Sequence, residues 1–312
     1  MTGNRILVHM AALMLLPIVI AWLGVSVAGA IALVLLFVLW RWGISLSTWV
    51  APAKTPELVL DTISASHFVE KVRWCMDRLG VDYRERPAGA TLSAFYLGYS
   101  VPRLRFRTGA VQSSIGNSAE ILRYLWGRYG AESGERGAFL EPTTERLALE
   151  RRIDRCGVDL QVWVYYHMLD HRELTLHAWG CNNPAIPAWQ RWALKALFPL
   201  QRSLIRKAFR ITPGHYRRAV GNISDLLAET EEKLADGRCS ILGGDEINFT
   251  DIAFASIMGL WLQPKAYGAG KAETVRLERS RLPEQMLRDM EDWSDRFPLS
   301  TAFMERLYAE RR

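Results

Sequence analysis

The sequence predicts a small α/β unit followed by an all-helical unit, both preceded by an apolar segment that enters a membrane. Three observations support this fold class. Short β-type runs alternate with helical patterns over residues 57–130, helical periodicity without clear strands fills residues 141–312, and no Asp, Glu, Lys or Arg occurs between Arg5 and Arg41. The 312 residues allow two or three structural units at ~100–200 residues per domain.

The composition excludes several classes of protein. Apolar residues make up 49 % of the chain and charged residues 23 %, which argues against an extensively disordered protein. The chain has four cysteines and no Cys-x-x-Cys pair, so we expect neither a disulfide scaffold nor a structural metal site. The net charge of +6 is too small a surplus to indicate nucleic-acid binding by itself.

Residues 1–50 are interpreted as a membrane anchor, and residues 51–56 as a linker. A bilayer span needs ~20 apolar residues, and this segment is too long for the ~7–15 apolar residues of a secretory signal. Two arrangements stay open: a tilted or kinked span over residues 17–40, or a hairpin with arms at 6–22 and 28–43. Positive residues on both sides favour the hairpin, with the following domains on the cytoplasmic side of the cell membrane.

The first part of residues 57–130 predicts a βαβ order. The apolar run 58–60 indicates a buried strand. Apolar residues at helical spacing over 67–79 indicate a helix that ends at Gly80. A second short strand is predicted over residues 81–85.

The second part of this unit predicts a ββα order. Residues 101–106 alternate between apolar and basic side chains, which is typical of a half-exposed strand opened by proline. Residues 110–112 are expected to return as a strand after a turn at 108–109. Asn117 and Ser118 then begin a helix whose Ile121, Leu122 and Leu125 point inward.

Three motifs in this unit together resemble the glutathione S-transferase superfamily, in particular bacterial members of serine type. They are residues 66–74 with 79–83, the Val101-Pro102 pair, which resembles the family's Val-cis-Pro, and residues 117–125, which resemble its acid-Ser-x-x-Ile-x-x-Tyr-Leu motif. The resemblance extends over residues 57–312. It implies a thioredoxin-like, glutathione-binding domain over residues 57–130 and the family's all-α C-terminal domain over residues 141–312.

Ser66 is the candidate catalytic residue, because the resemblance places it where serine-type transferases carry their functional hydroxyl. Conjugation needs the thiolate of glutathione, and lowering a thiol pKa from ~8.5 to ~6.5 takes about 2.7 kcal/mol. A helix N-terminus (up to ~2 kcal/mol) and a hydroxyl hydrogen bond (~1.5–3 kcal/mol) supply this without a metal. A plain N-cap is the alternative role of Ser66. His67 is expected to face solvent and is also a candidate for the substrate pocket.

Val101, Pro102, Asn117 and Ser118 are the candidate residues for binding glutathione as cosubstrate. The cis Val101–Pro102 bond that the resemblance implies would present the Val101 backbone to an extended peptide. Ser118 at a helix N-terminus suits the γ-glutamyl carboxylate. Asn117 stands where the family has an acid that pairs with the γ-glutamyl ammonium group, so we expect a reduced affinity. Helix capping alone is the alternative role of Asn117 and Ser118.

The second unit begins with a helix predicted from Pro142 towards Tyr166. The resemblance places this helix beside a hydrophobic acceptor pocket, so Trp163 and Tyr166 are candidate pocket residues, with an aromatic core as the alternative. Residues 248–251 have the form of a capping box before a long apolar run and are interpreted as structural.

A basic stretch is a further feature of this unit. Residues 174–224 contain eight Lys or Arg and no Asp or Glu. Five of them are spaced for a single helix face that lies mostly away from Trp192 and Leu200, namely Arg191, Lys195, Arg202, Arg206 and Arg210. This face is either solvated or in contact with anionic lipid. Nucleic-acid binding lacks a supporting motif.

These observations predict a membrane-anchored protein that conjugates the glutathione thiolate to a hydrophobic electrophile. The expected partners are glutathione, a hydrophobic small molecule, the lipid bilayer and, from the resemblance, a second copy in a homodimer. One alternative is a non-catalytic, membrane-tethered binding or assembly module, which Asn117 favours. Another is a glutathione-dependent reductase or isomerase that uses Cys75, although Cys75 lies on the apolar stripe of its helix and is expected in the core.

Overall fold

The computed structural model describes residues 15, 18–24, 26–50, 56–89, 101–108, 111–130 and 132–311. The chain divides into two compact units. The first comprises Met1–Glu57 and Phe106–Ser113, and the second comprises Leu58–Arg105 and Ser114–Arg312.

The described part of the apolar segment is helical with one break. A helical stretch covers residues 18–22 and is followed by a turn at Leu23 and Gly24. Gly24 has a φ of 84°, a conformation that favours glycine. Helix α2 (Val27–Val50) begins after Ser26, whose Oγ accepts a hydrogen bond from the Gly29 amide at 3.2 Å. Most of the predicted first arm, including residues 6–14, lies outside the described residues. In the part of the chain that the structure describes, no helix has both the length and the apolarity that crossing a membrane requires.

Among the described residues, one sheet contains four strands in the order β2-β1-β3-β4. They are β1 (Glu57–Thr62), β2 (Arg84–Pro87), β3 (Arg103–Thr108) and β4 (Val111–Gly116). Helix α3 (His67–Leu79) connects β1 to β2, which pair in parallel with Val59 opposite Arg84. The Val101–Pro102 bond before β3 is cis, as expected, and α5 (Ser118–Leu125) follows β4. The predicted order βαβ followed by ββα is confirmed.

Strand β2 begins three residues later than the prediction of 81–85. The cause is the cap at the end of α3, where Gly80 has a φ of 72° and its amide donates to the Asp77 carbonyl at 3.0 Å. The Val81 amide donates to the Met76 carbonyl at 3.1 Å, so it is not available to a strand. The Tyr83 hydroxyl donates to Asp77 Oδ1 at 2.7 Å and holds the chain against α3 until Arg84. Strands β3 and β4 also begin later than predicted, and Gly109 of the predicted turn lies outside the described residues.

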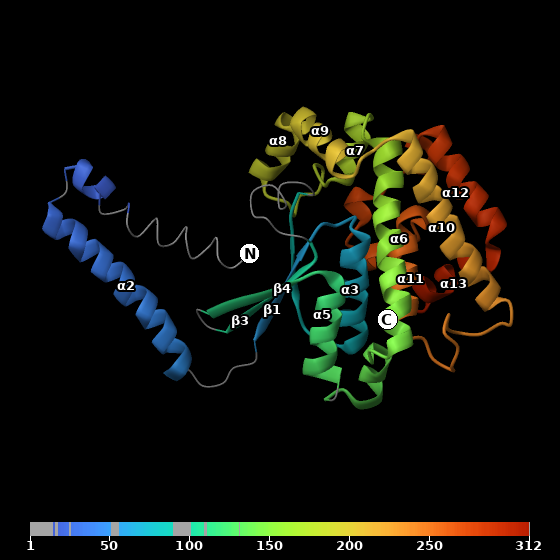
Figure 1. The fold of residues 1–312 in the computed structure, drawn as a ribbon, viewed down its shortest axis with the longest axis horizontal. Coiled ribbons are helices and arrows are strands. Elements are labelled where there is room, and N and C mark those ends of the chain that lie inside the picture. The colour runs from blue at the N-terminus through green and yellow to red at the C-terminus, as the bar shows by residue number, and fades with distance from the viewer. Residues whose placement is uncertain are drawn as a thin grey trace. The chain divides into compact units, whose positions relative to one another are not determined.

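The all-helical region is built around α11. Its helices are α6 (Thr144–Met168), α7 (Arg172–Ala178), α8 (Ala188–Ala196), α9 (Phe198–Ala208), α10 (Pro213–Leu234), α11 (Phe249–Leu262), α12 (Glu284–Arg296) and α13 (Pro298–Ala309). Short helical turns are η1 (Trp126–Gly130), η2 (Gly134–Leu140), η3 (Tyr267–Gly270), η4 (Glu273–Val275) and η5 (Arg279–Arg281). Helix α11 packs against α3, α6 and α13, and nearly all its side chains are buried (Figure 1). It therefore joins α3 to the helical core.

The start of α11 has the predicted capping box. Asn248 Oδ1 accepts from the Thr250 amide at 2.9 Å, and Asp251 Oδ2 accepts from the Asn248 amide at 2.8 Å. Asp251 also accepts from the Ser240 hydroxyl at 2.7 Å and from the Ile241 amide at 2.8 Å. Burial raises the pKa of the Asp251 carboxyl, and these bonds to it act in the opposite direction. All of its partners belong to the loop and helix start that it organises, which fits the structural interpretation.

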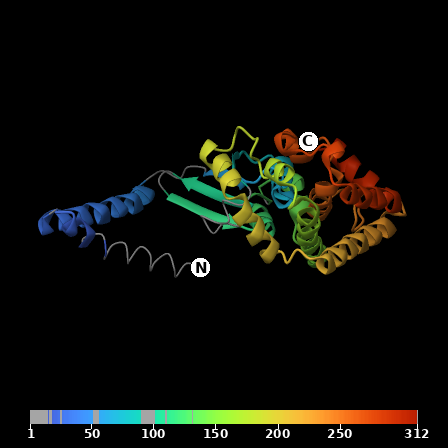
Figure 2. The same cartoon turned by 90° about the horizontal axis from the view of Figure 1, so that it is seen from above.

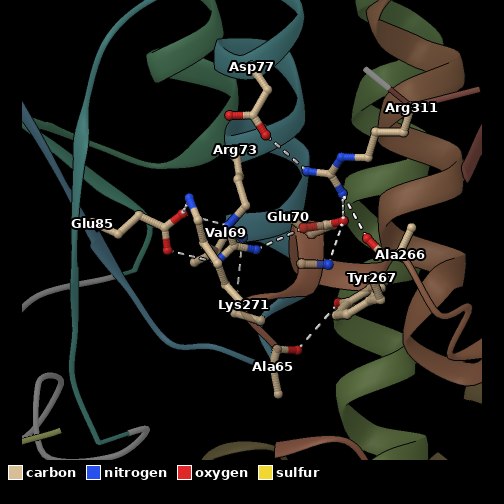
Figure 3. Close-up of polar contacts among 12 residues, drawn as sticks. Ala65, Val69, Glu70, Arg73, Asp77, Glu85, Ala266, Tyr267, Lys271 and Arg311 are labelled. Carbon is tan, nitrogen blue, oxygen red and sulfur yellow. Dashed lines mark hydrogen bonds and ion pairs between the residues drawn. The ribbon is translucent and has the colours of Figure 1, made fainter. Parts of the chain in front are cut away.

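A buried polar network joins α3 to the C-terminal segments (Figure 3). Glu70 on α3 is fully buried, and its Oε2 accepts from Arg73 at 2.8 Å. Its Oε1 accepts from the Gly268 amide at 2.9 Å and from the Tyr308 hydroxyl at 3.3 Å, and it forms an ion pair with Arg311. The network therefore ties one turn of α3 to η3 and to the end of α13.

Helices α7, α8 and α9 form a group with an apolar core of their own. That core contains Leu169, Leu176, Trp179, Cys181, Ala193, Leu194, Phe198 and Ile205. In both views α8 and α9, drawn in yellow, lie at the end of the helical region away from α12 and α13 (Figures 1 and 2). The prediction of one basic helix face is wrong, because Leu197 ends α8 with a non-helical ψ of 8° and Phe198 begins a second helix.

Candidate functional site

A cavity of about 960 Å³ lies in the second unit. Its wall includes Ser66, Val101, Pro102, Asn117 and Ser118, all of which were selected from the sequence. These residues come from three segments: the loop between β1 and α3, the chain before β3, and the junction of β4 with α5. The fold therefore brings together the candidate catalytic residue and the four candidate glutathione-binding residues.

Ser66 is the N-cap of α3. Its backbone is extended (φ −73°, ψ 120°), and its Oγ accepts from the Val69 amide at 3.4 Å. A hydroxyl that accepts one hydrogen bond still has its own hydrogen to donate. The capping role and a donor role toward an anion in the cavity are therefore compatible, and the N-terminal dipole of α3 favours such an anion.

His67 lies in the cavity wall but does not face solvent, so that prediction is wrong. Its side chain is 2 % exposed, and Nε2 lies 3.0 Å from the Gly157 carbonyl of α6. Because a carbonyl only accepts, Nε2 carries the proton. Burial lowers the pKa of His67 to about 4, so the ring adds no positive charge at neutral pH. Gly157 allows this approach, since a Cβ there would lie 3.2 Å from His67 Nε2 and 2.8 Å from the neighbouring Phe68 ring.

Asn117 and Ser118 shape the start of α5. Asn117 has a φ of 72°, which Asn tolerates better than most residues, and its Oδ1 accepts from the Ala119 amide at 3.0 Å. Ser118 is buried at the first position of the helix. Asn117 therefore acts as a cap, and it brings no charge to the cavity.

Trp163 and Tyr166 do not line the cavity, in contrast to the prediction. Trp163 is fully buried and its Nε1 donates to Asp289 at 2.7 Å, while Tyr166 stacks on Tyr216 with ring centroids 4.1 Å apart. The cavity side of α6 carries Tyr165 instead. Successive residues on a helix point about 100° apart, so Tyr165 and its neighbour Tyr166 face different directions.

The cavity face of α6 has a regular spacing that the sequence analysis missed. The α6 residues that line it recur every few positions: Arg151, Asp154, Arg155, Val158, Gln161, Val164, Tyr165 and Met168. This spacing of three to four residues was the signal available in the sequence. An apolar wall on this side is extended by Trp179 just after α7, Ile205 on α9, Phe209 just after α9 and Met286 on α12.

Tyr267 was also missed by the sequence analysis. It lines the cavity, and its hydroxyl donates to the carbonyl of Ala65 at 3.4 Å, next to Ser66 (Figure 3). Its neighbour Gly268 is bound to Glu70 by its amide at 2.9 Å. Two consecutive residues of η3 thus hold the loop and the first turn that position Ser66.

Cys75 lies in the core, as expected. It is fully buried, and burial raises the pKa of its thiol to about 12. A thiol with so high a pKa forms little thiolate at neutral pH, so the structure gives no support to a reductase or isomerase that uses Cys75. Among the described residues, no group of three or more His, Cys, Asp or Glu is placed to hold a metal ion.

No protein-family model matches the chain, and no curated protein matches it. Solved structures of glutathione S-transferases do. One from Methylobacterium radiotolerans, in complex with glutathione sulfonate, is 17 % identical over 81 % of this chain and 91 % of its own, with a TM-score of 0.49. A glutathione transferase family member from Pseudomonas fluorescens, with two glutathione bound, is 15 % identical over 86 % and 94 %, with a TM-score of 0.46. A rice enzyme in complex with glutathione is 17 % identical over 82 % and 95 %, with a TM-score of 0.37.

Proposed function

We propose that the chain is a glutathione S-transferase-like enzyme that conjugates the glutathione thiolate to a hydrophobic electrophile. The observation that carries this proposal is the shared cavity: Ser66, Val101–Pro102 and Asn117–Ser118 line one part, and apolar side chains of α6, α7, α9 and α12 line another. Glutathione is an extended, charged peptide with a thiol, so it suits the polar part. An apolar electrophile suits the other, and the motif resemblance of residues 66–74 with 79–83, 101–102 and 117–125 supports glutathione as the ligand.

Each polar group has a role in this proposal. The amides at the start of α5, with Ser118, bind the γ-glutamyl carboxylate. The backbone of Val101 pairs with the extended peptide. The Ser66 hydroxyl donates to the sulfur at the N-terminus of α3, and the thiol proton passes to solvent. Because His67 is neutral at neutral pH, the serine hydroxyl and the helix N-terminus stabilise the thiolate without it.

Replacing Ser66 by Asp tests the central role. Aspartate keeps a capping oxygen for α3 but offers no hydrogen to the sulfur and adds a negative charge beside it. One charge-assisted hydrogen bond is worth ~1.5–3 kcal/mol, so the fraction of bound glutathione present as thiolate should fall about tenfold or more. Ultraviolet absorbance of the thiolate in the glutathione complex, followed against pH, measures this fraction.

Two variants separate this effect from a loss of stability. Ser66→Thr keeps both the cap and the hydroxyl, so it should retain the thiolate absorbance. Thr143→Ala removes the cap of α6, where Thr143 Oγ1 accepts from the Arg146 amide at 3.3 Å, so it should lower stability without changing the absorbance. Wild-type absorbance in Ser66→Asp would contradict the proposed role.

Replacing Asn117 by Asp should tighten glutathione binding up to about fivefold, since a partly exposed ion pair is worth ~0.2–1 kcal/mol. Aspartate keeps the cap and tolerates the φ of 72°, and it adds a charge for the γ-glutamyl ammonium group. Calorimetry with glutathione and with N-acetylated glutathione measures the gain, which should be absent for the acetylated ligand. An equal gain for both ligands would rule out the ammonium group as the cause.

The second candidate function is a non-catalytic, membrane-tethered binding or assembly module. The specific observation in its favour is that Asn117 is uncharged and uses its side-chain oxygen to cap α5. Calorimetry on the wild-type chain separates the two functions, because the enzyme requires glutathione binding at millimolar concentration or below. No heat of binding for either the wild-type chain or Asn117→Asp would favour the module.

We also propose that the apolar segment holds the chain at the cell membrane, with the second unit in the cytoplasm. In support, the 35 residues between Arg5 and Arg41 contain no Asp, Glu, Lys or Arg. Large apolar side chains of α2, such as Ile31, Leu35 and Leu36, are also exposed. In intact cells, Ser26→Cys should react with a membrane-impermeant maleimide if the segment forms a complete hairpin. Labelling only after lysis would contradict the hairpin.

The homodimer expected from the resemblance stays a prediction.

A further inference from the structure

Helices α8 and α9 expose large apolar side chains. Trp189 and Trp192 on α8 are 60 % and 72 % exposed, and Leu200 on α9 is 54 % exposed. The two tryptophans are three residues apart and therefore lie on one face of α8. Among the described residues after the apolar N-terminal segment, these are the most exposed of the large hydrophobic side chains. The sequence had placed Trp192 and Leu200 mostly away from the basic residues.

The segment that carries these side chains is basic. Between residues 188 and 210 there are six Lys or Arg and no Asp or Glu. One carboxylate from outside this stretch, Asp170, pairs with both Arg202 and Arg206, the latter at 2.6 Å. Lys195, Lys207 and Arg210 are exposed. We call the set of Trp189, Trp192, Lys195, Leu200, Arg206, Lys207 and Arg210 the α8–α9 surface.

The α8–α9 surface has the composition of a membrane-surface contact. Tryptophan rings prefer the headgroup level of a bilayer, and Lys and Arg near the surface are attracted to anionic lipids. A single-stranded nucleic acid would also use the charge and the rings, but it needs successive stacking platforms, and Leu200 offers none. The combination of rings, an aliphatic side chain and cations therefore favours lipid.

The other side of α9 belongs to the cavity. Leu204, Ile205 and Phe209 line it, while Leu200 and Arg206 on the same helix are exposed. We infer that the α8–α9 surface docks on an anionic lipid bilayer, so that α9 separates the headgroups from the apolar wall of the cavity. This inference depends neither on the glutathione chemistry nor on a membrane span by the N-terminal segment. It adds to the proposed function that the apolar wall of the cavity lies next to the bilayer in which an apolar electrophile dissolves.

A spin label at residue 200 tests the inference on the full chain. In a Cys239→Ser background the other three cysteines are buried, so Leu200→Cys gives one reactive thiol. Collision of the label with oxygen, which concentrates in bilayers, is compared with collision with a water-soluble nickel complex. On phosphatidylcholine vesicles that contain phosphatidylglycerol, the oxygen-to-nickel ratio at residue 200 should rise several-fold over its value without vesicles. A label at Glu284→Cys, a position on α12 whose side chain is 82 % exposed, should keep its ratio.

One charge variant and two measurements that address other occupants of the surface complete the test. The triple variant Lys195→Gln, Lys207→Gln, Arg210→Gln should lose most of the rise at residue 200, whereas Arg288→Gln on α12 should not. The inference is overturned if the ratio at residue 200 stays equal to that at residue 284, whether or not the chain binds the vesicles. It is also overturned if a single-stranded oligonucleotide displaces the chain from the vesicles at equal charge concentration. If raising the protein concentration in the absence of vesicles immobilises the label, the surface binds a second copy of the chain instead of lipid.

Discussion

Glu70→Gln is expected to lower the free energy of unfolding by about 3–5 kcal/mol, the cost typical of removing one partner of a buried ion pair. Glu70 is fully buried. Its carboxylate accepts hydrogen bonds from Arg73 at 2.8 Å, the Gly268 amide at 2.9 Å and the Tyr308 hydroxyl at 3.3 Å, and it forms an ion pair with Arg311. Glutamine keeps the shape of the side chain but removes the charge that both guanidinium groups face. Denaturant unfolding of the full chain measures the change.

Glu284→Gln on α12 is the matched control. Glu284 is exposed and pairs with Arg288 at 2.7 Å one turn away on the same helix. Exposed pairs of this kind contribute ~0.3–0.5 kcal/mol, so its unfolding midpoint should hardly move. If Glu70→Gln and Glu284→Gln change the free energy of unfolding equally, the network is not a source of stability.

Acidification is expected to destabilise the chain through His67. Burial lowers the pKa of His67 to about 4 in the folded chain, whereas an unfolded histidine has a pKa of about 6.5. Between these values the unfolded state binds a proton that the folded state excludes. The stabilising contribution is therefore complete above about pH 6.5 and is lost as the pH falls to about 4. The difference corresponds to roughly 3 kcal/mol.

Unfolding of wild type and His67→Gln at a series of pH values measures this contribution. Glutamine can still donate to the Gly157 carbonyl, which accepts from His67 at 3.0 Å, but it does not titrate. The wild type should lose roughly 3 kcal/mol more stability than the variant between about pH 7 and pH 4. Parallel pH profiles would show that His67 is accessible to protons in the folded chain.

The elements that the sequence predicted well are those set by local signals. The helices after Ser66, Asn117 and Asn248 begin at these side chains because each accepts a hydrogen bond from an amide two or three residues later. Strand β2 was misplaced, although its signal is local too. The Val81 amide donates to the Met76 carbonyl in the helix cap, so it cannot also donate to a neighbouring strand. The β propensity of the residues does not include this competition.

The candidate site was predicted only where motifs mark it. Ser66 and Asn117 lie in motifs and line the cavity, whereas the contacts that surround them join distant parts of the chain. His67 meets Gly157 across 90 positions, and Tyr267 meets Ala65 across 202. The same limit applies to Trp163. The sequence indicates that an aromatic residue on α6 is buried, but it does not indicate whether the ring lines the cavity or contacts Asp289. The identity of the neighbour, which the sequence alone does not specify, decides between these outcomes.

The network at Glu70 also sets an order for biosynthesis. Arg311 is translated 241 positions after Glu70, which at ~5–20 residues per second is a delay of roughly 10–50 s. Until then α3 carries a carboxylate without one of its two cationic partners, and the amide of Gly268 arrives only late in the same interval. The contacts of Glu70 on α3 are therefore completed only after the helical region has been translated. A nascent chain that stalls before its last helix would present α3 to chaperones and proteases.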